Sequence, residues 1–172
     1  MAGFTESNIT LDFPSPHWFR FEHSLPYSDI SALHYKEMDA CWVKNMGTGT
    51  AEFFAIELKD YTNGNLGTTS SDRVWDIVKK VVDTIQMYLS ARFQQPFGQR
   101  LEAEKSVDLH TGIHVAKFIT IVDVAPADTM LFQALKDNCM IRLKGYTKVW
   151  DGIQVHVVTK QQAQRYFAEF VK

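Results

Sequence analysis

The chain has 172 residues, of which 18 are Lys or Arg and 20 are Asp or Glu, so its formal net charge is −2 and its isoelectric point is near 6.3. This length fits one domain with its own core, and a hydrophobic content of 45% excludes a disordered chain. The charge excludes binding of nucleic acid through bulk positive charge, although residues 1–60 hold nine acids and only four bases.

Localisation signals are missing from the sequence. Cys41 and Cys139 are the only cysteines, too few for a disulfide framework, which favours a reducing compartment. No apolar run approaches the ~20 residues that cross a bilayer. The first residues lack the positive charge and apolar stretch of a secretory signal. We therefore expect a cytoplasmic protein with no membrane contact.

The first third of the chain predicts an arm followed by strands. Residues 1–16 are polar and contain proline, so we expect them to form a flexible arm. Alternation predicts a strand over Trp18–Glu22, and Ser28 is placed to start a helical turn that reaches His34. Two further strands are expected at Glu37–Val43 and Glu52–Tyr61, and the glycine-containing loop between them would join them as an antiparallel hairpin.

The clearest element is a helix from Asp72 to Phe93. It follows a polar loop over residues 62–71, and Ser70 or Ser71 would be its N-cap. Its apolar residues recur at steps of three and four, which is typical of an amphipathic helix packed on a sheet. The charged residues of the other side, Arg73, Lys79 and Lys80 among them, are interpreted as a solvated face.

The second half continues with strands and helices after a polar connection. The pattern predicts a strand at Lys117–Val124 and then a helix at Ala127–Asn138. Strands are expected at Cys139–Lys144 and Lys148–Thr159, and a turn at Asp151-Gly152 would split the second of these regions. A helix is expected at Lys160–Phe170. No linker separates two domains. The sequence therefore predicts a single α/β (α+β) domain over residues 1–172, with a mixed central sheet flanked by helices.

The expected strand Glu52–Tyr61 carries the best candidate for chemistry. Glu57 and Lys59 are two residues apart, so their side chains share one face of the strand, and the hairpin would bring Asp39 beside Glu57. Two carboxylates can hold a Mg²⁺-type ion, and an ammonium group can orient a water molecule or stabilise charge on a phosphate. The alternative is an ordinary cross-strand ion pair, which contributes about 0.2–1 kcal/mol.

This arrangement resembles the PD-(D/E)xK nuclease superfamily, whose core is restriction-endonuclease-like. An Asp opens one strand, Glu-x-Lys lies in the next strand, and a long helix and another strand follow. The sequence departs from the family pattern at two places: Met38 stands where many members have Pro before the Asp, and no long helix is expected before Trp18. The resemblance implies that Asp39, Glu57 and the Leu58 carbonyl bind Mg²⁺ or Mn²⁺. It implies that Lys59 acts on the attacking water, that DNA is the substrate, and that the enzyme is a homodimer.

Several alternatives stay open from the sequence. Glu22 or Glu37 could add a carboxylate to the site, and His110 and His114 have an i, i+4 spacing that would suit a metal on a helix. A basic segment could follow a phosphate backbone through one face of a strand; it contains Lys136, Arg142, Lys144 and Lys148. The chain could instead be a non-catalytic binding or assembly subunit, or an enzyme for a small phosphorylated substrate.

Overall fold

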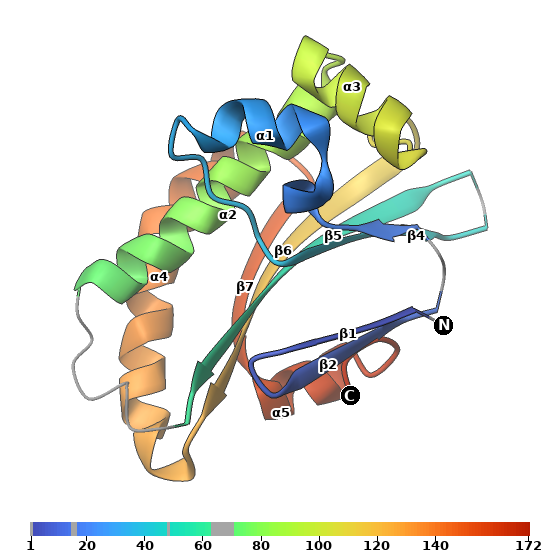
Figure 1. Ribbon diagram of the computed structural model, residues 1–172. Helices are drawn as coiled ribbons and strands as arrows, with labels where there is room; N and C mark the ends of the chain where they lie inside the picture. Colours follow the sequence, from blue (N-terminus) through green and yellow to red (C-terminus); the bar gives the residue numbers. More distant parts are fainter. Residues whose placement is uncertain (1, 15–16, 48, 63–70) are drawn as a thin grey trace.

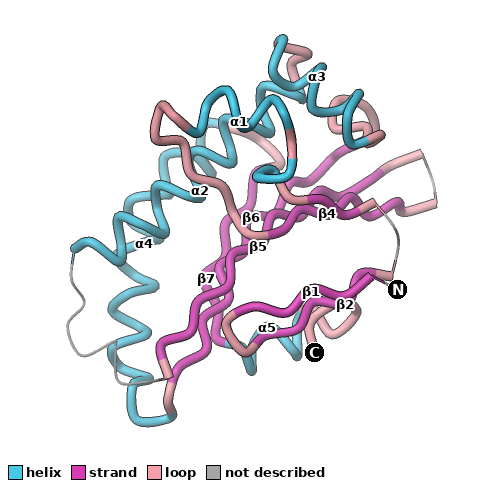
Figure 2. The backbone as a smooth tube through the Cα atoms, in the orientation of Figure 1, coloured by secondary structure: helices cyan, strands magenta, loops and turns pink. Residues whose placement is uncertain are grey.

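The computed structural model describes residues 2–14, 17–47, 49–62 and 71–172, and its centre is a five-stranded sheet (Figures 1 and 2). The strands of this sheet, in their spatial order, are β3 (Trp18–Phe19), β4 (Ala40–Asn45), β5 (Ala51–Tyr61), β6 (Ile113–Val124) and β7 (Ile153–Thr159). The pairs β3–β4 and β4–β5 are antiparallel, whereas β5–β6 and β6–β7 are parallel. The expected mixed sheet is thereby confirmed.

Helices cover both faces of this sheet and confirm the α/β (α+β) class. They are α1 (Leu25–Ser31), α2 (Ser71–Arg92), α3 (Pro96–Lys105), α4 (Thr129–Val149) and α5 (Lys160–Tyr166). In Figure 1, α2 and α4 cover one face, and α5 covers the other together with the hairpin of β1 (Ala2–Glu6) and β2 (Ile9–Phe13). Each face has its own apolar core. None of the helices within the described ranges is long and apolar enough to cross a membrane.

The N-terminal hairpin corrects the expectation of a flexible arm. Residues 2–13 form β1 and β2, while residues 1, 15 and 16 of the expected arm lie outside the described residues. Ile9, Leu11 and Phe13 have no exposed surface and pack on the sheet. Their alternation with Thr10 and Asp12 is a strand pattern, and burial of the three apolar side chains outweighs the polar composition of the segment.

The middle of the chain follows the expected order with shifted boundaries. The strand expected from Trp18 ends at Phe19, because a 3₁₀ turn occupies Phe21–His23. Helix α1 begins at Leu25, before the expected Ser28, since the Ser24 hydroxyl accepts the N–H of Tyr27 as an N-cap. Helix α2 begins at Ser71; the expected loop over 63–70, with Ser70 as an N-cap, lies outside the described residues.

The second half of the chain departs from the predicted elements at several places. Helix α3 lies in the expected polar connection and starts with Pro96. Helix α4 runs through Cys139–Lys144, so the strand expected there is wrong. Its buried residues recur at helical spacing; they are Phe132, Leu135, Cys139 and Leu143. The Asp151-Gly152 turn precedes β7 rather than splitting a strand, and α5 ends at Tyr166, before the expected Phe170.

Candidate active site

The structure brings Asp39, Glu57 and Lys59 together between the sheet and α2. Asp39 lies directly before β4, and its Oδ2 accepts the backbone N–H of Leu58 at 2.7 Å. The β4–β5 register pairs Ala40 with Ile56, so this side-chain hydrogen bond extends the ladder by one step. Glu57 and Lys59 project from the same face of β5, and Lys59 Nζ lies 2.9 Å from Glu57 Oε1. The hairpin geometry therefore fixes the acidic pair.

Lys80 of α2 is a fourth member of this cluster. Its Nζ lies 2.7 Å from Glu57 Oε1 and 3.3 Å from Asp39 Oδ1. The two carboxylate oxygens therefore cannot be farther apart than the sum of these distances, about 6 Å. The ammonium group occupies the space between the two acids and compensates their charge.

A second acid from α2, Asp76, extends the network toward solvent. Its Oδ2 accepts from Lys59 Nζ at 3.0 Å, and its Oδ1 accepts from Lys36 Nζ at 2.6 Å. Positive and negative groups thus alternate from Lys36 at the surface to Asp39 in the interior. The side chain of Glu57 is the most buried of the series, with 1% of its surface exposed.

Burial and neighbouring charges shift the protonation of these groups. Burial, followed by repulsion from Asp39, raises the pKa of Glu57 to about 7, although Lys59 and Lys80 oppose the shift. Burial lowers the pKa of Lys80, but attraction to Glu57 and Asp39 outweighs it and leaves the pKa above its usual value. The pKa of Lys59 is raised in the same way, by Glu57 and Asp76. Both lysines are therefore cations at neutral pH.

The donor set fits a divalent ion of the Mg²⁺ type. Glu57 Oε1 is buried and accepts no hydrogen bond of good geometry within the described part of the chain, although two ammonium groups lie nearby. A buried carboxylate oxygen of this kind is an available ligand, and Asp39 Oδ1 faces the same point. The Leu58 carbonyl oxygen accepts one hydrogen bond, from Ser7 Oγ at 3.3 Å, so its second lone pair could bind an ion.

A surface hollow of about 560 Å³ opens beside Asp76. It is lined by residues from α2, the end of β5 and the segment before β4: Lys36, Tyr61, Asp72, Arg73, Trp75, Asp76 and Lys79. Because Asp76 also binds Lys59, the hollow adjoins the charged network.

Sequence reasoning missed the contribution of α2. Lys80 was interpreted as part of a solvated face, but only 20% of its side-chain surface is exposed. Its neighbour Lys79 does lie toward solvent, with 42% exposed, and pairs with Asp83. The signal that could have found Lys80 is its i, i+4 spacing from Asp76, which places both side chains on one edge of the apolar stripe.

The other predicted acids have partners of their own. Glu22 pairs with Arg20 at 2.7 Å, and Glu37 accepts a hydrogen bond from the hydroxyl of Tyr27.

His110 lies 3.1 Å from Glu102 and 3.2 Å from Asp108, a set of ligands that could hold a metal. These contacts, rather than a helical pairing with His114, surround His110: His114 belongs to strand β6.

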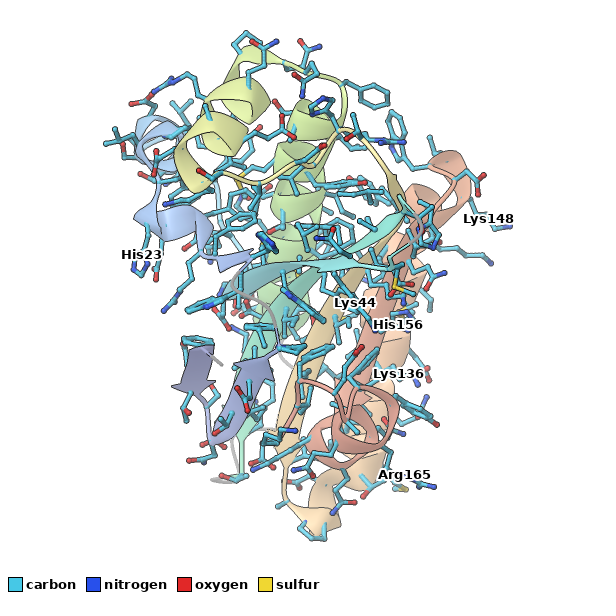
Figure 3. The ribbon with its side chains drawn as sticks, turned by 90° about the vertical axis from the view of Figure 1, so that its right-hand side faces the viewer. His23, Lys44, Lys136, Lys148, His156 and Arg165 are labelled. Carbon is cyan, nitrogen blue, oxygen red and sulfur yellow. The ribbon has the colours of Figure 1, made fainter. Side chains whose placement is uncertain are left out.

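The basic segment has a different geometry from the expected one. Arg142 and Lys144 belong to α4, where residues two apart point to different sides, so the shared strand face is wrong. Lys136 and Lys148 lie along the same helix on the side of the molecule seen in Figure 3, together with His156. Arg142 instead lies over the ring of Trp75, 4.9 Å from its centroid.

Comparison with known proteins adds no relative: no protein-family model, no curated protein and no solved structure matches this chain.

Proposed function

We propose that the protein is a metal-dependent nuclease that hydrolyses phosphodiester bonds in DNA, on a restriction-endonuclease-like core. The observation that carries this proposal is the convergence of Asp39 and Glu57 on the point occupied by the Lys80 ammonium, with Lys59 beside them. A cation is already favoured at that point. The mixed sheet, in which a β-hairpin is followed by a long helix and a parallel strand, supports the same family of folds.

In this proposal each side chain has one task. Asp39, Glu57 and the Leu58 carbonyl hold Mg²⁺ or Mn²⁺, which when bound supplies a Lewis acid and an acidified water. Lys59 is kept in place by Asp76 and holds its positive charge toward the reacting phosphate, where it stabilises the charge of the transition state. Lys80 would have to give up this place to a bound ion, because both cations would compete for Glu57.

The test is a cleavage assay on single-stranded, duplex and branched DNA with Mg²⁺ or Mn²⁺. Glu57→Gln and Lys59→Ala should each lower the rate about 100-fold or more, since one loses an ion ligand and the other loses the charge at the phosphate. The matched control is Glu52→Gln on the same strand, whose partner is Lys117, and its rate should stay at the wild-type level. Absence of cleavage by the wild type with either ion would refute the proposal.

A second candidate function is a non-catalytic binding or assembly subunit. Lys80 favours it, because its ammonium compensates both acids without any added ion. Titration with Mn²⁺ separates the two functions. A nuclease should gain thermal stability that Glu57→Gln abolishes, whereas the subunit should show neither heat of binding nor a thermal shift.

A cytoplasmic location belongs to the same proposal. Cys41 and Cys139 are both free thiols, and both are buried. Such cysteines behave as small apolar core residues and suit a reducing compartment. Fluorescence microscopy of a tagged chain in its native cell would test the location.

A further inference from the structure

The hollow beside Asp76 has an aromatic wall that the proposed chemistry does not use. Trp75 and Tyr61 both line it, and 54% of the surface of Trp75 is exposed. Arg142 lies over one face of the Trp75 ring, so a flat ligand can stack only on the opposite face. Because Asp76 lines the same hollow and binds Lys59, this aromatic wall adjoins the charged network.

Each of these aromatic rings is accompanied by an arginine. The guanidinium of Arg142 lies 4.9 Å from the ring centroid of Trp75, and that of Arg73 lies 5.1 Å from that of Tyr61. Within the described residues neither arginine pairs with a carboxylate, and Arg73 Nη1 has no hydrogen-bond partner there. Arg73 Nη1 is buried, so the ligand would meet the positive charge of Arg73 rather than this donor. Both guanidinium groups therefore keep a positive charge beside the rings.

The acids of the hollow do not cancel this charge. Asp76 is already paired with Lys36 and Lys59, which leaves Asp72 as the other acid of the lining. A ligand that fits must present a flat ring to Trp75 and an anionic group to the arginines. A nucleotide has both, and its base is free to stack only when it is unpaired, because a duplex covers both faces of each base.

We propose that this hollow, together with the adjoining Arg142, binds an unpaired nucleotide of a nucleic-acid strand, with its base on the face of Trp75 that Arg142 does not cover and its phosphates on Arg73 and Arg142. The inference rests on the proposed function only in naming a strand as the ligand, since binding here needs no metal ion. A strand held in this hollow lies beside Asp76, which binds Lys59 of the proposed active site. The substrate is then single-stranded DNA or the unpaired part of a branched structure.

The test measures binding in EDTA, so that cleavage cannot occur. Anisotropy of a labelled single-stranded oligonucleotide should report binding to the wild type, with weaker binding of the same sequence as a duplex. Trp75→Ala should weaken the single-strand affinity about 10-fold, as expected for the loss of one stacked base, and Trp75→Phe should retain most of it.

Two variants serve as matched controls. Phe93→Ala removes an aromatic residue that follows α2 at its other end and is exposed to the same degree, 55%. Lys144→Ala removes a charge from α4 as Arg142→Ala does, but from another side of the helix. Phe93→Ala and Lys144→Ala should bind like the wild type, and Arg142→Ala should lose affinity. Circular dichroism establishes that each variant is folded.

Three results would overturn the inference. The first is that the duplex binds as tightly as the single strand or more tightly, and the second is that Trp75→Ala and Phe93→Ala lose the same amount of single-strand affinity. The third result is that a free mononucleotide displaces the labelled strand at an equal concentration of nucleotides. The last result would assign the hollow to a small phosphorylated ligand. The nuclease proposal is judged separately, because cleavage that is insensitive to Trp75→Ala refutes only the binding site, whereas Trp75-dependent binding without cleavage refutes only the nuclease.

Discussion

At the scale of single residues, the Lys80 ammonium is what allows two acids to share the interior. Asp39 and Glu57 are both buried, and two carboxylates at such a distance repel each other in a medium of low dielectric constant. The ammonium group lies within 3.3 Å of each. Removing it leaves the acids uncompensated unless another cation takes its place.

Lys80→Met tests this compensation. Without added metal, the variant should lose about 1–3 kcal/mol of unfolding free energy, because one partner of a partly buried ion network is removed. It should also bind Mn²⁺ more tightly than the wild type, since no ammonium group competes for Glu57. Thermal unfolding in EDTA and calorimetric titration with Mn²⁺ measure the two effects. Lys79→Met, on the exposed side of α2, is the control, and unchanged or weaker Mn²⁺ binding by Lys80→Met would contradict the compensation.

Glu57 should make the stability of the metal-free protein depend on pH. Its pKa is raised from 4.5 to about 7, so the folded chain holds this proton more tightly than the unfolded chain does. The contribution to stability is therefore complete below pH 4.5 and is lost as pH rises through about 7, up to about 3 kcal/mol in all. Urea unfolding at pH 5 and pH 8 should show this loss in the wild type and a smaller one in Glu57→Gln. An equal loss in both would refute it.

Of the five residues in the charged network between the sheet and α2, the sequence could predict three but not the other two. Asp39, Glu57 and Lys59 lie on neighbouring strands, where alternation and a hairpin settle which side chains meet. Asp76 and Lys80 lie at the edge of a helical stripe, where a polar residue can point either to solvent or back over the sheet. The long aliphatic stem of Lys80 lets its ammonium group reach back over the sheet, and only the packing of α2 decides between this inward orientation and one toward solvent.

At the scale of elements, the contact between α2 and α3 depends on Gly98. A Cβ atom on Gly98 would lie 2.2 Å from Ala91 Cα, so the two helices approach each other through their backbones. Because backbone cannot move aside as a side chain can, any larger residue must separate the helices.

Gly98→Ala should lower the free energy of unfolding by about 3 kcal/mol or more, whereas Gly145→Ala in α4 should raise it by about 0.5–1 kcal/mol. No atom lies within 4 Å of a Cβ on Gly145, so that variant gains only the better helix propensity of alanine. Chemical denaturation of both variants measures the difference. A stable Gly98→Ala protein would mean that α3 is not packed so closely.

The boundaries of α4 illustrate why elements were harder to predict than strand faces. Residues 141–144 alternate apolar and polar side chains as a strand does, whereas Cys139 and Leu143 continue the helical spacing of Phe132 and Leu135. A segment as short as residues 139–144 can be read as a strand or as part of a helix. The length of the helical pattern, carried from Thr129 to Val149, decides for the helix because it buries one continuous stripe.

At the scale of the whole molecule, the hairpin of β1 and β2 closes the second core. Phe13 has no exposed surface and contacts three aromatic rings, those of Trp18, Trp42 and Phe170. This core lies on the face of the sheet opposite α2, so the charged network and the hairpin stabilise different sides of the same strands.

Phe13→Ala should lower the free energy of unfolding by about 3–5 kcal/mol, the usual cost of removing a buried phenylalanine. Phe4→Ala in the same hairpin should cost less, because Phe4 is only partly buried. Urea unfolding followed by tryptophan fluorescence measures both. A loss below about 1 kcal/mol in Phe13→Ala would show that the hairpin contributes little to folding.

The contact between the two ends of the chain also governs how folding can proceed during synthesis. Asp12 N–H donates to the carbonyl of Phe170, Lys172 N–H donates to that of Thr10, and Leu11 is bridged to Val171. The hairpin is synthesised well before Phe170 and Val171, which contact it. Phe13 can pack on Trp18 and Trp42 early, but its contact with Phe170 forms only after every strand of the five-stranded sheet has been made. The second core is therefore completed last, which gives this fold contacts of high sequence separation and favours slow folding.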